Sequence, residues 1–306
     1  MGSSFSEMLS LQLMLFCLIV IGVVVKKVGI VNVSGRKVLT DLLIDIILPC
    51  NIIKSFMGGI SISEEFVHNS ILMLVISAGV EIIAVYGSKL LFIKFPKEKK
   101  SVLSYGMICS NSGFIGLPMA EMMLSDPAGV GYASIYLIPL RFTMWTAGLS
   151  LFTNVDKKDA FRKLARHPCI LAVFIGILLM VLPLPLPGFL NNTIEGISKC
   201  TTPISMIVIG AILADAPVKS LFSPSVLYYA FLRLIAFPIF VYAVLLPFHL
   251  DPLVVDVALL MAAMPAGSTT SILADKYGGD VAFSSQIVFT STLFSIFTIP
   301  LMSFLM

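Results

Sequence analysis

Asn111-Ser-Gly-Phe-Ile-Gly-Leu-Pro118 and Met264-Pro-Ala-Gly-Ser-Thr-Thr270 are the two stretches that decide the fold. Each places Gly, Pro and small polar residues in the middle of an apolar segment that is long enough to cross a membrane. A helix in lipid keeps its backbone polar groups paired. Each group that a break exposes costs roughly several kcal/mol unless protein, a water-filled cavity or a ligand satisfies it. Both stretches therefore predict a helix that is interrupted inside the membrane.

The composition is that of an all-α polytopic membrane protein. Of the 306 residues, 58% are hydrophobic and 12% are charged, and the mean hydropathy is +1.02; a soluble domain carries about 25% charged residues. The five cysteines form no CxxC pair and the three histidines lie far apart, so no metal site is predicted. No phosphate loop, dinucleotide motif or nucleophile elbow occurs, so we expect neither an enzyme nor a cofactor, and no nucleic-acid partner.

Ten segments are apolar over the roughly 20 residues that a spanning helix needs. They cover residues 8–26, 37–57, 66–93, 101–124, 129–152, 168–186, 192–214, 221–247, 252–275 and 280–304. The two interrupted stretches lie in the fourth and the ninth segment, about half a chain length apart. They therefore occupy corresponding places in the two halves of the chain.

The basic residues predict how the segments are oriented. Sixteen of the twenty Lys and Arg residues lie in or beside the odd-numbered loops, which places those loops in the cytoplasm and both termini outside. Residues 1–152 then form one five-helix repeat, residues 153–167 a cytoplasmic connector, and residues 168–306 a second, inverted repeat. Broken helices at matching places in inverted repeats point to the substrate site of a secondary transporter in the bilayer.

Two patterns resemble the fourth and ninth helices of the auxin efflux carrier family, which includes the plant PIN-FORMED carriers and bacterial organic-acid permeases. They are Asn111-x-x-x-x-Gly116-x-Pro118 and Pro265-x-Gly267-x-x-x-x-x-x-Ala274-x-x-Tyr277. The resemblance covers the whole chain. The chain lacks the long cytosolic loop of the plant carriers and is similar to the compact prokaryotic type.

The resemblance implies a ten-helix inverted repeat with broken, crossing helices four and nine. Helices one, two, six and seven would form a scaffold that dimerises, and helices three to five and eight to ten a mobile transport unit. It also implies elevator-type transport of small organic anions across the plasma membrane, the inner membrane in bacteria. The sequence leaves open whether H⁺, Na⁺ or no ion is coupled, and in which direction the substrate moves. A membrane-embedded ligand sensor with the same fold is the main alternative.

The two breaks supply the candidates for substrate binding. Asn111 offers amide donors to a substrate carboxylate or to freed carbonyl groups, and both interpretations stay open. The small residues after Pro265 offer close backbone approach and hydroxyl groups, unless the break is only a packing kink. The full set at the breaks is Asn111, Ser112, Gly113, Gly116, Pro118, Pro265, Gly267, Ser268, Thr269 and Thr270.

Charged residues inside the predicted spans complete the set of candidates. A central Arg costs roughly 2.5–3.5 kcal/mol, so Arg141 and Arg233 must be compensated, either by an anionic substrate or by a structural ion pair. Glu81 is the candidate partner of Arg233 in such a pair. Asp45, Glu81 and Gln286 are the candidates for ion coupling.

Overall fold

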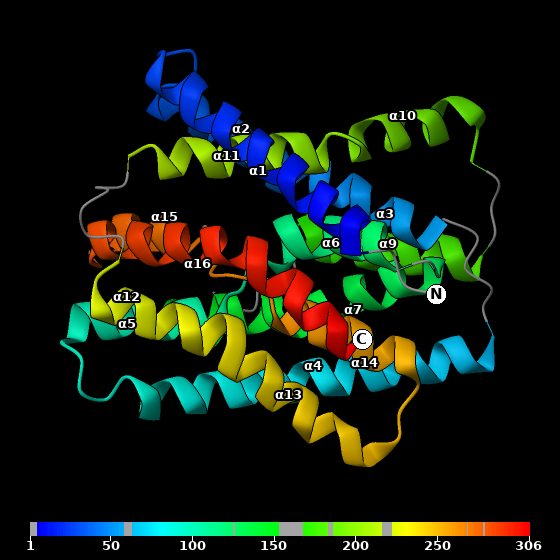
Figure 1. Ribbon diagram of the computed structural model, residues 1–306. Helices are drawn as coiled ribbons and strands as arrows, with labels where there is room; N and C mark the ends of the chain where they lie inside the picture. The colour runs from blue at the N-terminus through cyan, green and yellow to red at the C-terminus, as the bar shows by residue number, and fades with distance from the viewer. Residues whose placement is uncertain are drawn as a thin grey trace. The chain divides into compact units, whose positions relative to one another are not determined.

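The computed structural model describes residues 5–57, 63–124, 126–152, 168–182, 186–215, 222–267, 269–277 and 279–306. Within these ranges every regular element is a helix (Figure 1), and the one β-type contact is an isolated bridge. The all-helical fold predicted from the composition is confirmed for these ranges. The predicted connector 153–167 and the candidate Ser268 lie outside them.

The helices form two compact units, each assembled from separate stretches of the chain. The first unit contains Met1–Leu72, Gly113–Ile135 and Ala165–Ala214, and the second contains Met73–Ser112, Tyr136–Leu164 and Asp215–Met306. Two long helices, α4 (Glu64–Leu91) and α7 (Pro127–Thr143), contribute residues to both units. Each unit therefore combines residues from both halves of the sequence.

The first unit is held together where helices from the two halves of the chain cross. Its elements are α1 (Phe5–Lys27), α2 (Val33–Leu42), η1 (Leu43–Ile47), α3 (Leu48–Met57), most of η2 (Ser112–Gly116), α6 (Leu117–Met123), α9 (Pro168–Val181), α10 (Gly188–Ser198) and α11 (Thr201–Leu213). A Cβ atom added at Gly22 would overlap the Ile207 carbonyl oxygen on α11, and one added at Gly210 would overlap the Ile19 carbonyl oxygen on α1. Small residues allow membrane helices to approach backbone to backbone, so this glycine pair sets the crossing of α1 and α11.

A second crossing in the same unit joins α3 to α9 and α10. Gly176 on α9 lies against the ring of Phe56, which a side chain at position 176 would overlap. The Asn51 side chain on α3 donates from Nδ2 to Ser198 Oγ on α10 at 3.0 Å. The buried amide group of Asn51 is thus paired within the unit.

The second unit contains the remaining helices. They are α5 (Lys97–Ile108), η3 (Met144–Gly148), η4 (Leu149–Leu151), α12 (Pro224–Phe231), η6 (Leu232–Ala236), α13 (Phe237–Leu245), η7 (Leu246–Phe248), α14 (Pro252–Ala262), α15 (Thr269–Tyr277), α16 (Val281–Met302) and η8 (Ser303–Leu305). Helix α14 begins at Pro252, where Asp251 Oδ1 accepts the N–H groups of Leu253 at 2.9 Å and Val254 at 3.3 Å. Its last six residues, 257–262, are all buried, so α14 leads into the core of the unit.

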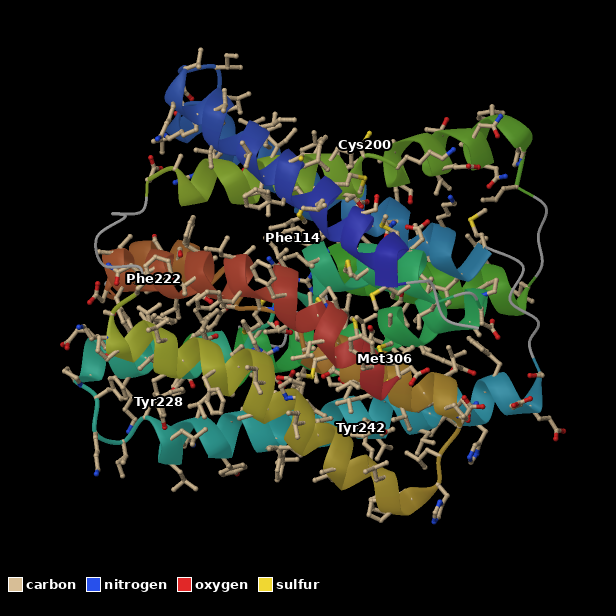
Figure 2. The ribbon with its side chains drawn as sticks, viewed as in Figure 1. Phe114, Cys200, Phe222, Tyr228, Tyr242 and Met306 are labelled. Atoms are coloured by element: carbon tan, nitrogen blue, oxygen red, sulfur yellow. The ribbon has the colours of Figure 1, made fainter. Side chains whose placement is uncertain are left out.

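Prolines account for most of the departures from α-helical geometry. Of the four π-helices in the described ranges, η1, η2 and η6 end two residues before a proline, at Pro49, Pro118 and Pro238. Proline has no N–H to donate to the carbonyl four residues earlier. A neighbouring hydroxyl group can donate to that carbonyl instead. Because Pro118 has no N–H, the carbonyl of Phe114 (labelled in Figure 2) lacks its α-helical donor. Ser205 Oγ donates to this carbonyl at 3.4 Å.

The helices agree with the predicted segments, and the ten-span arrangement stays a prediction. Each of the ten predicted segments overlaps one or more helices. Within the described ranges, three continuous helices are long and apolar enough to cross a membrane: Glu64–Leu91, Pro224–Phe248 and Val281–Leu305. The predicted segments 101–124 and 252–275 are each divided into two helices, at the places where the sequence predicted a break.

Candidate functional site

The two breaks meet in the second unit and pair through their backbones. Ser110 and Ala266 form an antiparallel bridge. The Asn111 N–H donates to the Pro265 carbonyl at 2.7 Å, and the Gly267 N–H donates to the Cys109 carbonyl at 2.8 Å. Groups that the broken helices leave without helical partners therefore satisfy one another. Residues 109–111 and 265–267 of the two interrupted segments therefore lie side by side.

Local chemistry explains why each helix ends at this crossing. Helix α5 ends at Ile108, and Cys109 adopts an extended conformation with φ −104° and ψ 91°. Helix α14 ends at Ala262, three residues before Pro265, and α15 begins only at Thr269. A Cβ atom at Gly267 would lie 2.8 Å from the Cys109 carbonyl oxygen, so this approach of the two chains requires glycine.

Hydroxyl groups hold the crossing against the neighbouring helices. Ser112 Oγ donates to the Met261 carbonyl on α14 at 2.9 Å. Ser291 Oγ on α16 accepts the Ala266 N–H at 3.2 Å. Tyr105 on α5 donates to Thr269 Oγ1 at 3.4 Å. Sequence reasoning included Ser112 and Thr269 but missed Ser291 and Tyr105. The clustering of Ser and Thr in the tenth apolar segment was a signal for Ser291, and Tyr105 had none.

Two side chains at the crossing carry polar atoms that the protein leaves unpaired. Asn111 is 2% exposed and Thr270 is fully buried. Among the described residues, neither Asn111 Nδ2 nor Thr270 Oγ1 has a hydrogen-bond partner. The Asn111 amide nitrogen therefore does not cap a freed carbonyl in this structure, and it is available to a bound acceptor.

The two arginines and the glutamate that the sequence singled out also lie in the second unit. Arg141, on α7, and Arg233, on η6, are both buried, and so is Glu81 on α4. Arg141 interacts electrostatically with Tyr105 and Cys109, which lie beside the crossing. Its Nε atom has no hydrogen-bond partner within the described part of the chain.

Glu81 and Arg233 do not form the direct ion pair that the sequence suggested. They interact electrostatically. Both residues are described in full, yet Glu81 Oε2 and Arg233 Nε and Nη1 have no hydrogen-bond partner. The Arg233 guanidinium carbon instead lies 5.2 Å from the ring centre of Phe237. The Arg233 guanidinium group therefore packs on Phe237 and interacts with Glu81 only at longer range.

The other candidates make none of the contacts described above. Gln286 is buried on α16 and has an interaction partner. Gly113, Gly116 and Pro118 belong to the first unit, on η2 and α6, and Asp45 is an exposed residue on η1 of that unit. The described side chains include no group of three or more His, Cys, Asp or Glu residues that could hold a metal ion.

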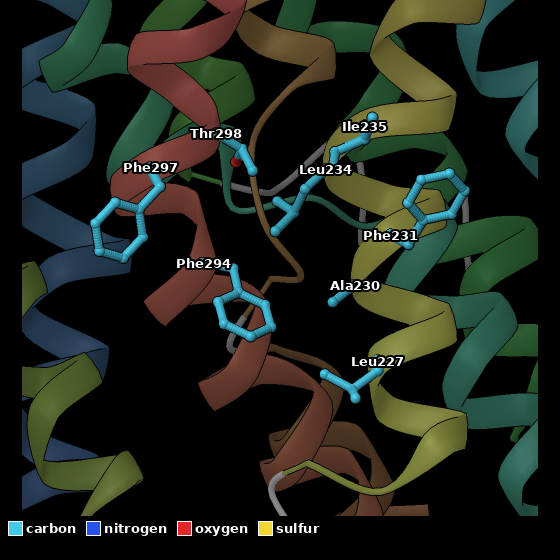
Figure 3. Close-up of a pocket in the computed structure, with 8 residues that line it drawn as sticks. All are labelled: Leu227, Ala230, Phe231, Leu234, Ile235, Phe294, Phe297 and Thr298. Atoms are coloured by element: carbon cyan, nitrogen blue, oxygen red, sulfur yellow. The ribbon is translucent and has the colours of Figure 1, made fainter.

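A separate pocket in the second unit has the wrong chemistry for an anion. It has a volume of about 250 Å³ and lies between the α12–η6 segment and α16 (Figure 3). Its lining is apolar except for one hydroxyl group: Leu227, Ala230, Phe231, Leu234, Ile235, Phe294, Phe297 and Thr298. We therefore place the candidate polar site at the crossing and not in this pocket.

Comparison with known proteins gives matches along the whole chain. A family model described as "Membrane transport protein" matches residues 8–161 and 157–303. An uncharacterized transporter of Methanocaldococcus jannaschii is 24% identical over 299 residues, which cover 94% of this chain and 96% of that protein. An uncharacterized transporter of Methanothermobacter thermautotrophicus is 22% identical over 290 residues, 94% of each chain. A protein of Rhizobium meliloti, named provisionally as a malonate transporter, is 26% identical over 198 residues, 62% of each chain.

Proposed function

Because this chain belongs to the auxin efflux carrier family of membrane transport proteins, we propose that it is a secondary transporter of small organic anions. Its family and its relatives are transporters, not enzymes. The proposed substrates are small carboxylates. The proposed location is the plasma membrane, which is the inner membrane in bacteria.

The observation that carries the proposal is the set of unpaired donors around the paired breaks. Asn111 Nδ2 and the Nε atoms of Arg141 and Arg233 can only donate, and the Thr270 hydroxyl group can donate or accept. Buried donors without partners are costly, and a carboxylate supplies up to four acceptor positions and a negative charge. The two arginines add positive charge where the membrane offers no other compensation. An organic anion fits these groups better than a cation or a neutral solute.

The Rhizobium meliloti relative supports the choice of carboxylates, since its provisional name describes a malonate transporter. We extend that substrate class to this chain as a proposal. Malonate and other mono- and dicarboxylates of similar size are the first compounds to test.

The proposed mechanism is alternating access of the elevator type. Ten helices would form two inverted repeats, residues 1–152 and 168–306, with both termini outside. Helices three to five and eight to ten would carry the crossing and its substrate past a scaffold of helices one, two, six and seven. The scaffold helices would also form a homodimer. Inverted repeats with broken helices at the site are the common basis of such movement.

Counterflow in proteoliposomes tests this function against the sensor alternative. Vesicles loaded with unlabelled malonate are diluted into labelled malonate, and uptake of label is followed with and without imposed proton and sodium gradients. A transporter gives transient accumulation of label. A sensor binds malonate with no counterflow, and that result, repeated over the panel of carboxylates, would reject the proposed function.

A further inference from the structure

We propose that Glu81 carries a coupling proton, and that Arg233 makes binding of this proton and of an anion cooperative. The inference rests on the proposed function and identifies the coupled ion. Glu81 is the only buried carboxylate among the side chains that the structure describes, at 4% exposed. Its Oε2 atom has no hydrogen-bond partner. An ionised carboxylate without hydrogen bonds is costly in such a place, whereas a protonated one is neutral.

The groups that face Glu81 come from three other elements. They are Arg233 on η6, Tyr136 on α7 and Cys109 at the end of α5. Tyr229 on α12 faces Arg233 in turn. Arg233 is the only permanent charge in this group, and its Nε and Nη1 atoms are unpaired. The charge state of Glu81 therefore decides whether the Arg233 charge is balanced.

This arrangement favours a proton over a sodium ion. A sodium ion needs several oxygen ligands, whereas the groups that interact with Glu81 are the Arg233 guanidinium group, the Tyr136 hydroxyl group and the Cys109 thiol group. Arg233 would also repel a metal cation held at Glu81. A proton needs no shell of ligands, because it forms one O–H bond with a carboxylate oxygen.

The proposed cycle follows from the charge balance. A proton from the aqueous phase binds a Glu81 carboxylate oxygen and makes the side chain neutral. The Arg233 charge is then unbalanced, which favours an anion at the crossing, where Cys109 interacts with both residues. On the other side of the membrane the anion leaves and the proton returns to water. By linkage, each ligand strengthens binding of the other to the same extent.

Two measurements on purified, full-length protein test the inference. The first is proton uptake, followed with a pH-sensitive dye in weakly buffered solution, when malonate is added. The second needs no substrate: the infrared C=O stretching band of protonated carboxyl groups is followed during a pH titration in lipid, and the component of it that persists to the highest pH is the band compared between variants. Both compare the wild type with Glu81→Gln and with Asp256→Asn. Asp256, on α14 of the same unit, is a partly buried carboxylate and serves as the matched control.

At a pH at which the substrate-free wild type has lost the infrared band, we expect the wild type and Asp256→Asn to take up about one proton for each malonate bound. Glu81→Gln should bind malonate without proton uptake and should lack the infrared band. Persistence of the uptake or of the band in Glu81→Gln, or their loss in Asp256→Asn alone, would overturn the assignment. If malonate and the other carboxylates do not bind the wild type, the proposed substrate class fails, and the infrared titration still decides the role of Glu81. Should Glu81→Gln not fold, the double variant with Arg233→Gln removes both charges of this interacting pair and is expected to lack the band.

Discussion

Two buried asparagines show how one residue type serves two purposes in this chain. Asn51 and Asn111 are 7% and 2% exposed. The Asn51 amide nitrogen donates to Ser198 within the first unit, whereas that of Asn111 has no partner among the described residues. A buried donor without a partner costs about 1–3 kcal/mol. This difference identifies the Asn111 amide nitrogen as a donor that is available to a ligand.

Asn111→Ala is therefore expected to weaken malonate binding by roughly 1.5–3 kcal/mol, which is the value of a hydrogen bond to a charged group. This loss corresponds to an affinity about 10- to 100-fold lower. Calorimetry on purified protein measures the change. The thermal midpoint should stay close to that of the wild type, because no hydrogen bond within the protein is lost at Nδ2. Asn51→Ala is the matched control, and it should lower the thermal midpoint and leave affinity unchanged. Unchanged affinity in folded Asn111→Ala protein would remove Asn111 from the site.

Gly267 is the position at the crossing where one added methyl group has the largest predicted effect. In Gly267→Ala the new Cβ atom would lie 2.8 Å from the Cys109 carbonyl oxygen, so the two paired segments must separate. We expect loss of stability of about 1–3 kcal/mol and loss of counterflow. Gly87→Ala on α4, where an added Cβ meets no atom within 4 Å, is the control. Equal melting temperatures for the two variants would mean that this close approach does not exist.

At the scale of elements, the sequence predicted where helices break but not how the breaks pair. Pro118 and Pro265 interrupt apolar segments, and that signal is local. The pairing of Ser110 with Ala266 depends on how α5, α14 and α16 pack, and a one-residue shift in this pairing is invisible in the sequence. For the same reason the acceptor role of Ser291 was not predicted, and packing on Phe237 was not foreseen for Arg233.

The crossing of α1 and α11 gives a stability prediction at this scale. Gly22→Ala should force the two helices apart, because the new Cβ atom would overlap the Ile207 carbonyl oxygen. Overpacking of this kind costs about 1–3 kcal/mol. Thermal unfolding in detergent measures it. Gly196→Ala on α10 of the same unit, where an added Cβ meets no atom within 4 Å, should be neutral or stabilising. A normal melting temperature for Gly22→Ala would contradict the backbone-to-backbone packing.

At the scale of the whole molecule, composition and apolar periodicity predicted the helical membrane class, and the family match supports it. Orientation rests on the positive charges alone. The residues that determine it include the basic connector 153–167, which lies outside the described ranges. Side-chain contacts decide the site, and these could not be read from spacing, as the packing of Arg233 on Phe237 illustrates.

Cysteine labelling tests the orientation directly. The five native cysteines are first replaced, and a single cysteine is introduced at Ser3 or at Lys158. With both termini outside and the connector inside, an impermeant thiol reagent on intact cells should label the first variant and not the second. Both should react in permeabilised cells, which serves as the control. The reverse pattern would invert the proposed topology.

The backbone pairing of the two breaks also sets an order of events during synthesis. The Asn111 N–H and the Cys109 carbonyl find their partners in Pro265 and Gly267, which the ribosome adds much later. Until then two backbone groups remain unpaired in the bilayer, at roughly several kcal/mol each. The first half of the chain therefore needs the second half to pair its backbone groups, as one subunit of a heterodimer needs the other. Residues 1–152 expressed alone should be degraded in the membrane, and co-expression of residues 168–306 should restore them.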